Sequence, residues 1–154
     1  MKTVLILTLA LFTFSLISTR KTENVTQEAV TKEAPDNDFN LTDVMTQCNE
    51  SFRIQMSYLE ALNVSGSIPD ETDKTPKCFL RCVLEKTKVL SEDGEFDVER
   101  TADVLSMVRH GTAKNDVEEM ANRCSDRPEK CQCERSYNYL KCLIEADLER
   151  HKME

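Results

Sequence analysis

The sequence predicts an all-α fold, and three observations support that prediction. From residue 38 onward, apolar residues recur every three or four positions, which is the period of an amphipathic helix. No stretch shows the sustained alternation of a strand, and proline and glycine fall between the periodic segments. Seven cysteines follow an apolar N-terminal segment, which indicates an exported chain with disulfides. We therefore expect six short helices within one domain over residues 38–154.

The first three expected helices have apolar stripes over residues 41–52, 54–62 and 78–90. Gly66 follows the second stripe and Gly94 follows the third, as expected where helices end. In the third helix, two cysteines four residues apart belong to the apolar stripe itself. This spacing places both on one face of that helix.

The last three expected helices have apolar stripes over residues 98–108, 117–124 and 133–144. Asn115 stands three residues before Glu118, an arrangement that resembles an N-cap with its capping-box partner. We therefore expect the fifth helix to begin at Asn115. No internal repeat is present in the sequence.

The N-terminal residues have the layout of a secretory signal peptide. Lys2 is followed by 14 uncharged, mostly apolar residues over 4–17 and then by small and polar residues. A membrane anchor is the alternative, but a span needs about 17–25 apolar residues. The prediction is a signal peptide over residues 1–19, a flexible polar tail over 20–37 and a secreted, extracellular protein. Asn24 in this tail is the preferred candidate among four N-glycosylation sequons.

Cysteines in an exported chain are expected to form disulfides, and zinc is the competing interpretation. The C-x3-C and C-x-C spacings are not those of usual zinc pairs, and the two histidines, His110 and His151, are far apart in sequence. We therefore expect neither a metal nor a cofactor.

Geometry restricts the disulfide pairing without deciding it. Cys78 and Cys82 have Cβ atoms about 5–6 Å apart on one helix face, whereas a disulfide needs about 3.8 Å. Cys133 and Cys142 are nine residues apart, so they point to opposite sides of one helix. Any six cysteines still allow 15 pairings, and the seventh can be chosen in seven ways.

The cysteine spacing carries a family resemblance. The chain has 29, 3, 41, 8 and 8 residues between successive members of the set Cys48, Cys78, Cys82, Cys124, Cys133 and Cys142. This pattern resembles the six-cysteine signature of the insect odorant-binding (pheromone-binding) proteins, over residues 38–148. Ile68-Pro69-Asp70 and Gly94-Glu95-Phe96 add to the likeness. The resemblance implies a six-helix domain with a central apolar cavity and the pairs Cys48–Cys82, Cys78–Cys133 and Cys124–Cys142.

Cys131 departs from the family pattern. One interpretation is a free thiol at the start of a helix, and the other is an intermolecular disulfide to a second copy. A membrane receptor is a further candidate partner.

The resemblance implies a carrier that binds a small hydrophobic molecule reversibly, such as an odorant or pheromone. Apolar walls from several helices would surround the ligand, and tyrosine hydroxyls would orient it. Plain core packing is the competing role for each candidate wall residue. These candidates are Phe52, Ile54, Met56, Tyr58, Leu62, Phe79, Val83, Leu84, Phe96, Leu105, Met107, Val108, Met120, Tyr137, Leu140 and Ile144. The segment after Cys142 could cover the pocket with Leu143, Ile144 and Leu148.

Charge and motifs argue against other classes. A net charge of −8 and the absence of a glycine-rich phosphate loop exclude nucleic acid as an expected partner. No Ser-His-Asp, Cys-His or paired-carboxylate motif stands out, so we expect no enzyme. The alternative function is a secreted protein-interacting, reproductive or hemolymph signalling protein on the same scaffold, without a small ligand.

Overall fold

The computed structural model describes residues 39–109 and 111–153. The expected signal peptide over 1–19, the expected tail over 20–37 and the sequon at Asn24 lie outside these described residues.

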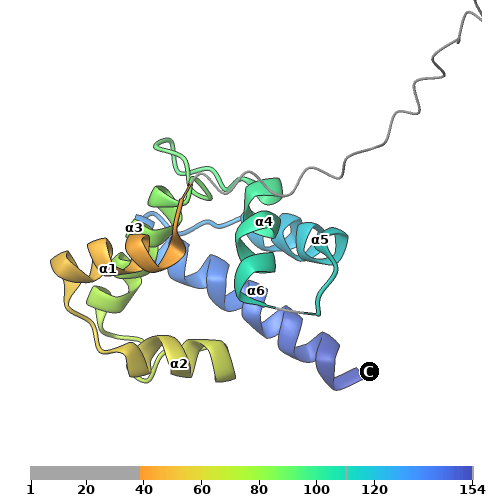
Figure 1. Cartoon of the computed structure of the whole chain (residues 1–154), viewed down its shortest axis with the longest axis horizontal. Helices are drawn as coiled ribbons and strands as arrows, with labels where there is room; N and C mark the ends of the chain where they lie inside the picture. The colour runs from red at the N-terminus through yellow and green to blue at the C-terminus, as the bar shows by residue number, and fades with distance from the viewer. Residues whose placement is uncertain (1–38, 110, 154) are drawn as a thin grey trace, which may run out of the picture. The chain divides into compact units, whose positions relative to one another are not determined.

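Six α-helices account for most of the described residues (Figure 1), which confirms the all-α prediction. In the part of the chain that the structure describes, Leu90 and Phe96 form an isolated antiparallel bridge between helices. The helices are α1 Leu41–Phe52, α2 Met56–Ser65, α3 Lys74–Lys86, α4 Val98–Val108, α5 Lys114–Ser125 and α6 Gln132–Met153.

Side-chain caps explain where several helices begin. The Asn40 Oδ1 atom accepts hydrogen bonds from the backbone N–H groups of Thr42 and Asp43, at 2.9 and 3.4 Å, at the start of α1. Asp73 and Asp97 cap α3 and α4 in the same way. Each cap satisfies backbone donors that have no partner within the helix.

The expected start of α5 at Asn115 is wrong. The N-cap is Ala113, whose carbonyl accepts from the N–H groups of Asp116 and Val117 at 3.0 and 3.2 Å, and its side chain makes no cap hydrogen bond. Asn115 lies inside the helix. The hydroxyl of the preceding Thr112 donates to the carboxylate of a residue on α6, so a tertiary contact holds the chain at this point.

Leu90 does not belong to a helix, because α3 ends at Lys86. Lys88 then has a φ of 61°, a left-handed conformation that stops the helix. Ile54 likewise precedes α2, which begins at Met56. The spacing of both apolar residues continues a helical stripe and so predicts a helix, but the backbone is not helical at either position.

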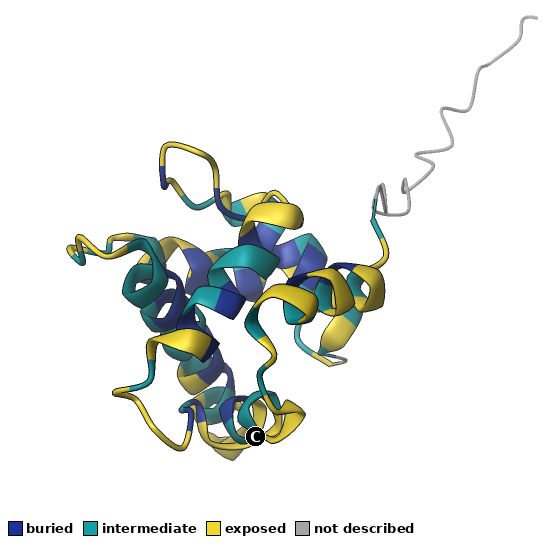
Figure 2. Cartoon of the chain, turned by 90° about the vertical axis from the view of Figure 1, so that its left-hand side faces the viewer, coloured by how far each residue is buried: buried dark blue, intermediate teal, exposed yellow. Residues whose placement is uncertain are grey.

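The helix α6 lies at the centre of the described domain. It packs against α3, α5 and α2, while α1 packs on α3 and α4 packs on α5 (Figure 1). The buried residues lie on the inward faces of the helices, as Figure 2 shows. Buried Tyr137 and Tyr139 are two residues apart, so they point to different sides of α6 and join different core clusters.

The buried residues form two clusters. The first cluster lies among α1, α2, α3 and α6 and comprises Val44, Cys48, Leu62, Ile68, Phe79, Leu80, Tyr137 and Ile144. The second cluster involves the end of α3 with α4, α5 and α6 and comprises Leu84, Val89, Leu90, Ala102, Val104, Val117, Met120, Ala121, Cys124, Tyr139 and Leu143.

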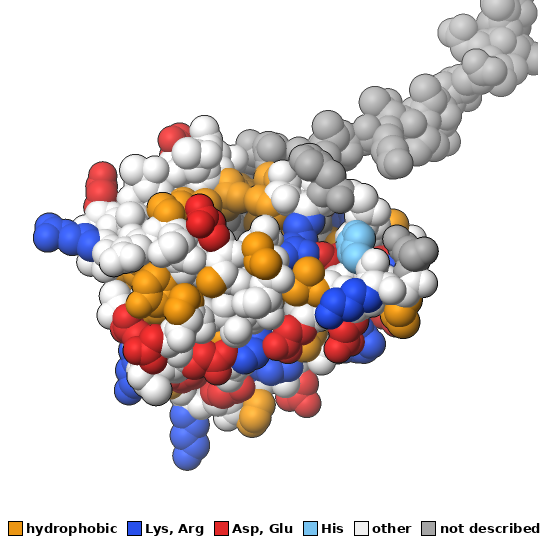
Figure 3. Space-filling view, turned by 90° about the horizontal axis from the view of Figure 1, so that it is seen from below, with side chains coloured by type: hydrophobic (Ala, Val, Ile, Leu, Met, Phe, Trp, Pro, Cys, Tyr) orange, Lys and Arg blue, Asp and Glu red, His pale blue; other side chains and the backbone are white. Residues whose placement is uncertain are grey.

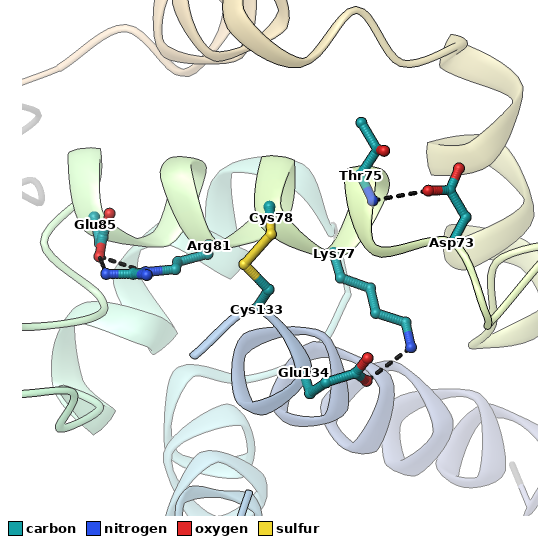
Figure 4. The surroundings of a disulfide bond; sticks show 8 residues. All are labelled: Asp73, Thr75, Lys77, Cys78, Arg81, Glu85, Cys133 and Glu134. Carbon is teal, nitrogen blue, oxygen red and sulfur yellow. Dashed lines mark hydrogen bonds and ion pairs between the residues drawn. A yellow bond between two sulfur atoms is a disulfide. The ribbon is translucent and has the colours of Figure 1, made fainter. Parts of the chain in front are cut away.

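Three disulfides connect the helices, with the pairing that the family resemblance implies. Cys48–Cys82 joins α1 to α3, Cys78–Cys133 joins α3 to α6, and Cys124–Cys142 joins α5 to α6. The second bridge lies beside an ion pair between Lys77 and Glu134, whose nitrogen and oxygen are 2.7 Å apart (Figure 4). None of the three bridges reaches α2 or α4.

Cys131 is an exposed free thiol just before α6. Backbone hydrogen bonds from Glu134 and Cys133 lower the pKa of this thiol. A lower pKa raises the thiolate fraction at neutral pH, and the thiolate is the form that attacks disulfides.

A polar network closes the first cluster at Tyr137. Its hydroxyl donates to Glu71 Oε1 at 2.5 Å and accepts from the backbone N–H of Ile68 at 3.3 Å. Lys141 Nζ also donates to Glu71 Oε1, at 2.5 Å. The hydrogen bonds from Lys141 and then from Tyr137 lower the pKa of the Glu71 carboxyl below its usual value.

The Glu71→Gln variant is therefore expected to be less stable than the wild type at neutral pH. A lowered pKa in the folded state stabilises the fold above the unfolded pKa of about 4.3, and this contribution disappears as the pH falls through the folded value. Because this side chain is 46% exposed, the difference at pH 7 should be at most about 1 kcal/mol. Urea unfolding at pH 7 and pH 3 should show the difference shrinking in acid. Glu119→Gln on the exposed face of α5 is the charge-matched control, and a pH-independent difference for Glu71→Gln would contradict the assignment.

Candidate functional site

An apolar cavity lies among α4, α5 and α6. Arg109, Thr112 and Asp147 also border it, but the surface of the cavity itself is apolar. The apolar wall comprises Leu105, Val117, Met120, Leu143 and Ile144.

The volume of this cavity is about 10 Å³. That is room for about one water molecule, whereas pockets for small organic ligands measure about 300–1,000 Å³. This cavity is thus almost filled in this conformation, so a ligand would need its walls to move apart.

The structure distributes the sixteen candidate wall residues over both clusters. Leu105, Met120 and Ile144 line the cavity. Leu84 belongs to the second cluster, and Phe96 packs against it. Leu140 packs against both clusters. Those belonging to or packed on the first cluster are Phe52, Ile54, Tyr58, Leu62, Phe79, Val83 and Tyr137.

The remaining three candidates are in neither cluster. Met56 and Val108 are 52% and 50% exposed, and Met107 is half-buried. A helical stripe separates inward from outward positions, but it does not say which of two clusters an inward residue joins. Of the three expected orienting hydroxyls, on Tyr58, Tyr137 and Tyr139, two are occupied. Tyr137 donates to Glu71, and the Tyr139 hydroxyl lies 2.7 Å from that of Thr101.

The sequence does not predict that Arg109, Thr112 and Asp147 come together beside the cavity. The sequence does indicate that Asp147 faces inward, because it continues the helical spacing of Leu140 and Leu143 on α6. The sequence pattern places Val117 on a helical stripe and predicts Leu143 only as a cover of the pocket. The partners of Asp147 carry no signal, because they come from residues 35 and 38 positions away in the sequence.

The Asp147 carboxylate is the centre of the polar group that it forms with Arg109 and Thr112. Its side chain is 6% exposed, and its Oδ2 atom forms an ion pair with Nη1 of Arg109. The Thr112 hydroxyl donates to Oδ1 at 2.7 Å. A buried carboxylate is tolerated only where a cation and hydrogen-bond donors compensate its lost hydration, and both are present here.

Arg109 links this carboxylate to a third helix. Its Nη2 atom donates to the backbone carbonyl and the side-chain Oδ1 of Asn63 on α2, at 2.9 and 2.8 Å. Arg109 directly follows α4, as its C-cap residue. A single guanidinium therefore connects the end of α4 to both α2 and α6.

A surface depression of about 260 Å³ lies on the other side of these polar residues. It shares Arg109, Thr112 and Asp147 with the cavity. Its other lining residues are Asn63, Val108, Leu148 and His151. The three shared residues therefore border both the apolar cavity and the surface depression.

Two further grooves lie elsewhere on the surface. One, of about 500 Å³, is lined by α1 and by Met56 at the start of α2. The other, of about 450 Å³, is mostly polar and lies along α6. Acidic, basic and hydrophobic side chains are intermixed on the face seen from below (Figure 3). Among the described residues on that face, no broad basic patch is present to attract a polyphosphate.

Between 39 and 153, residue 110 aside, no three His, Cys, Asp or Glu side chains are grouped so as to hold a metal ion. Within these ranges no helix has the length and apolar character to cross a membrane.

The sequence model of the PBP/GOBP family matches residues 24–146, which is most of the chain. The chain belongs to this family of insect odorant-binding proteins. The prediction from the cysteine pattern is thereby confirmed. PBP/GOBP proteins are non-enzymatic binding proteins, so the exclusion of an enzyme also holds.

One curated relative of this PBP/GOBP chain is General odorant-binding protein 84a of Drosophila melanogaster. The two are 28% identical over 103 residues, which is 66% of this chain and 55% of the relative. The chain thus matches only about half the length of that protein.

Two solved structures show the same fold. The odorant-binding protein lmigOBP1 of Locusta migratoria has a TM-score of 0.57 at 20% identity, covering 72% of this chain and 81% of that one. The medfly odorant-binding protein CcapOBP22/CcapOBP69a has a TM-score of 0.54 at 19% identity, covering 73% and 92%. The PBP/GOBP chain therefore has the six-helix architecture of these proteins.

Proposed function

We propose that this protein is a secreted carrier that binds a small hydrophobic molecule reversibly among α4, α5 and α6. The observation that carries the proposal is the apolar cavity among these helices, inside a disulfide-linked domain of the PBP/GOBP family. The name of the Drosophila relative, an odorant-binding protein, supports a ligand of that class. The apolar segment over residues 4–17 and the three disulfides support export to an oxidising compartment.

The disulfide arrangement supports a cavity that can enlarge. α5 and α6, which form two of its walls, are covalently joined by Cys124–Cys142. α4, which supplies Leu105, has no disulfide and packs mainly on α5. Met120 adds an unbranched, adaptable side chain to the wall. A ligand would therefore find one movable wall opposite two fixed ones.

The expected affinity is modest. Burying about 300 Å² of a medium-sized lipophile at about 25 cal/mol per Å² yields about 7 kcal/mol before the costs of association. Subtracting these costs leaves binding in the micromolar range at best. Such affinity suits uptake and release rather than storage.

The fluorescent probe N-phenyl-1-naphthylamine should bind the purified protein with micromolar affinity, and medium-chain alcohols and esters should displace it. Replacing Leu105 with Trp should fill the cavity and weaken probe binding at least tenfold, about 1.4 kcal/mol. Leu59→Trp is the matched control, because Leu59 is also half-buried but packs on the first cluster, and it should leave the affinity unchanged. Equal losses in both variants would contradict this location.

The second candidate function is a protein-interacting or signalling role on the same scaffold. The cavity volume of about 10 Å³ favours it, since a filled core needs no ligand. No probe binding and no displacement by any lipophile, with the protein folded, would support this alternative. A membrane receptor or a second copy bound through Cys131 stays a prediction from the sequence.

A further inference from the structure

The helix α4 is attached to α6 in different ways at its two ends. Near its start, Tyr139 of α6 stacks on Phe96 with ring centroids 3.9 Å apart, and its hydroxyl lies 2.7 Å from that of Thr101. Tyr139 and Thr101 are 0% and 2% exposed. This attachment is buried and combines a stacked ring pair with a hydroxyl contact, so it resists separation.

At the other end of α4, the contacts that Arg109 makes with α6 are polar. The Arg109 guanidinium binds Asp147 of α6 and Asn63 of α2. The adjoining Val108 is 50% exposed and belongs to neither core cluster. Water can replace polar partners far more readily than it can replace an apolar contact, so this end separates at lower cost.

The cavity lies beside the polar attachment. Arg109 and Asp147 line it directly, together with Leu105, which is one helical turn before Arg109. If α4 pivots about the Tyr139 contact as a rigid helix, its Arg109 end moves furthest. The movement that makes room beside Leu105 therefore breaks the contact between Arg109 and Asp147.

We infer that α4 is the movable wall of the binding site and that the Arg109–Asp147 ion pair is the latch that holds it closed. This inference rests on the proposed carrier function and adds how access to the site is controlled. Both latch residues border the cavity and the depression lined by Asn63, Val108, Leu148 and His151. Opening the latch therefore joins these two spaces. The ligand-bound state has the latch open, because the closed cavity has no room for a ligand.

This arrangement has an unusual consequence for affinity. A protein that binds ligand only in a minor, open state has an apparent dissociation constant raised by the rarity of that state. Weakening the latch populates the open state, so it should tighten binding. A contact that merely supports the fold would have the opposite effect when removed.

The Asp147→Asn variant tests the inference, because it removes the charge of the latch while keeping the size of the side chain. Stopped-flow and equilibrium titration with N-phenyl-1-naphthylamine should show an association rate constant and an affinity at least tenfold higher than in the wild type. The dissociation rate constant should change less than threefold. Arg109→Gln removes the other partner of the same ion pair and should raise the association rate constant and the affinity in the same way. The inference can therefore be tested even if one of the two variants fails to fold.

The control is Glu134→Gln, which breaks the ion pair with the buried Lys77 at the other end of α6. This variant should leave probe affinity unchanged. Unchanged or weaker binding in a folded Asp147→Asn protein would overturn the latch while leaving the carrier function intact. Absence of probe binding in the wild type and in every variant would instead overturn the carrier function, and the latch with it.

Discussion

Replacing Cys78 and Cys133 together with alanine is expected to lower the free energy of unfolding by about 4 kcal/mol. The bridge joins residues 55 positions apart, the largest separation of the three disulfides that the structure describes. A crosslink restricts the unfolded chain more strongly when the loop it closes is longer. It also joins α3 to α6, the helix around which both core clusters are built.

Cys131 decides how this experiment is done. It lies two residues before Cys133 and has an exposed thiol of lowered pKa, so it can attack neighbouring bridges. The Cys78 and Cys133 variant should therefore be made in a Cys131→Ser background. Urea unfolding then compares it with the Cys131→Ser protein. Removing Cys124 and Cys142 in the same background is the control.

The control bridge closes a separation of 18 residues, so its loss should cost less, about 3 kcal/mol. A double variant at Cys78 and Cys133 that is as stable as its Cys131→Ser parent would contradict the assigned role. An order of losses opposite to that of the loop lengths would show that native-state contacts outweigh chain entropy. Thiol counting after unfolding verifies which bridges are present in each sample.

The Tyr139→Ala variant is expected to lose about 3–5 kcal/mol of stability, the usual cost of removing a large buried ring. Tyr139 is fully buried in the second cluster, stacks on Phe96 and meets the Thr101 hydroxyl. Burial raises the pKa of Tyr139 to about 12, so its hydroxyl remains protonated at neutral pH. Thermal and urea unfolding measure the loss.

The Tyr139→Phe variant separates the ring from the hydroxyl. It keeps the stacked ring, and the Thr101 hydroxyl still donates to the Asp97 carbonyl at 2.6 Å, so the expected loss is only about 1 kcal/mol. Similar losses in the two variants would show that the hydroxyl, rather than the ring, holds α4 to α6. That result would also remove the apolar pivot on which the latch depends.

The local features of this fold could be predicted from the sequence because their causes are local. The spacing of Leu41, Val44 and Cys48 expresses the helical period over neighbouring residues, and the structure has α1 there. The limits of this reasoning appear at Leu90 and Asn115. A stripe continues through Leu90 although α3 has ended, and α5 begins before Asn115, where Thr112 is held by α6.

The sequence by itself determined the helical class, the disulfide-rich character and the family resemblance, because helical period and cysteine spacing are written along the chain. Only the tertiary structure decided that Leu105, Met120 and Ile144 meet at one cavity and that Asp147 meets Arg109. The latter pair is 38 residues apart and is joined by the way α4 lies across α6. Such contacts depend on how the helices pack, and no local pattern in the chain specifies that packing.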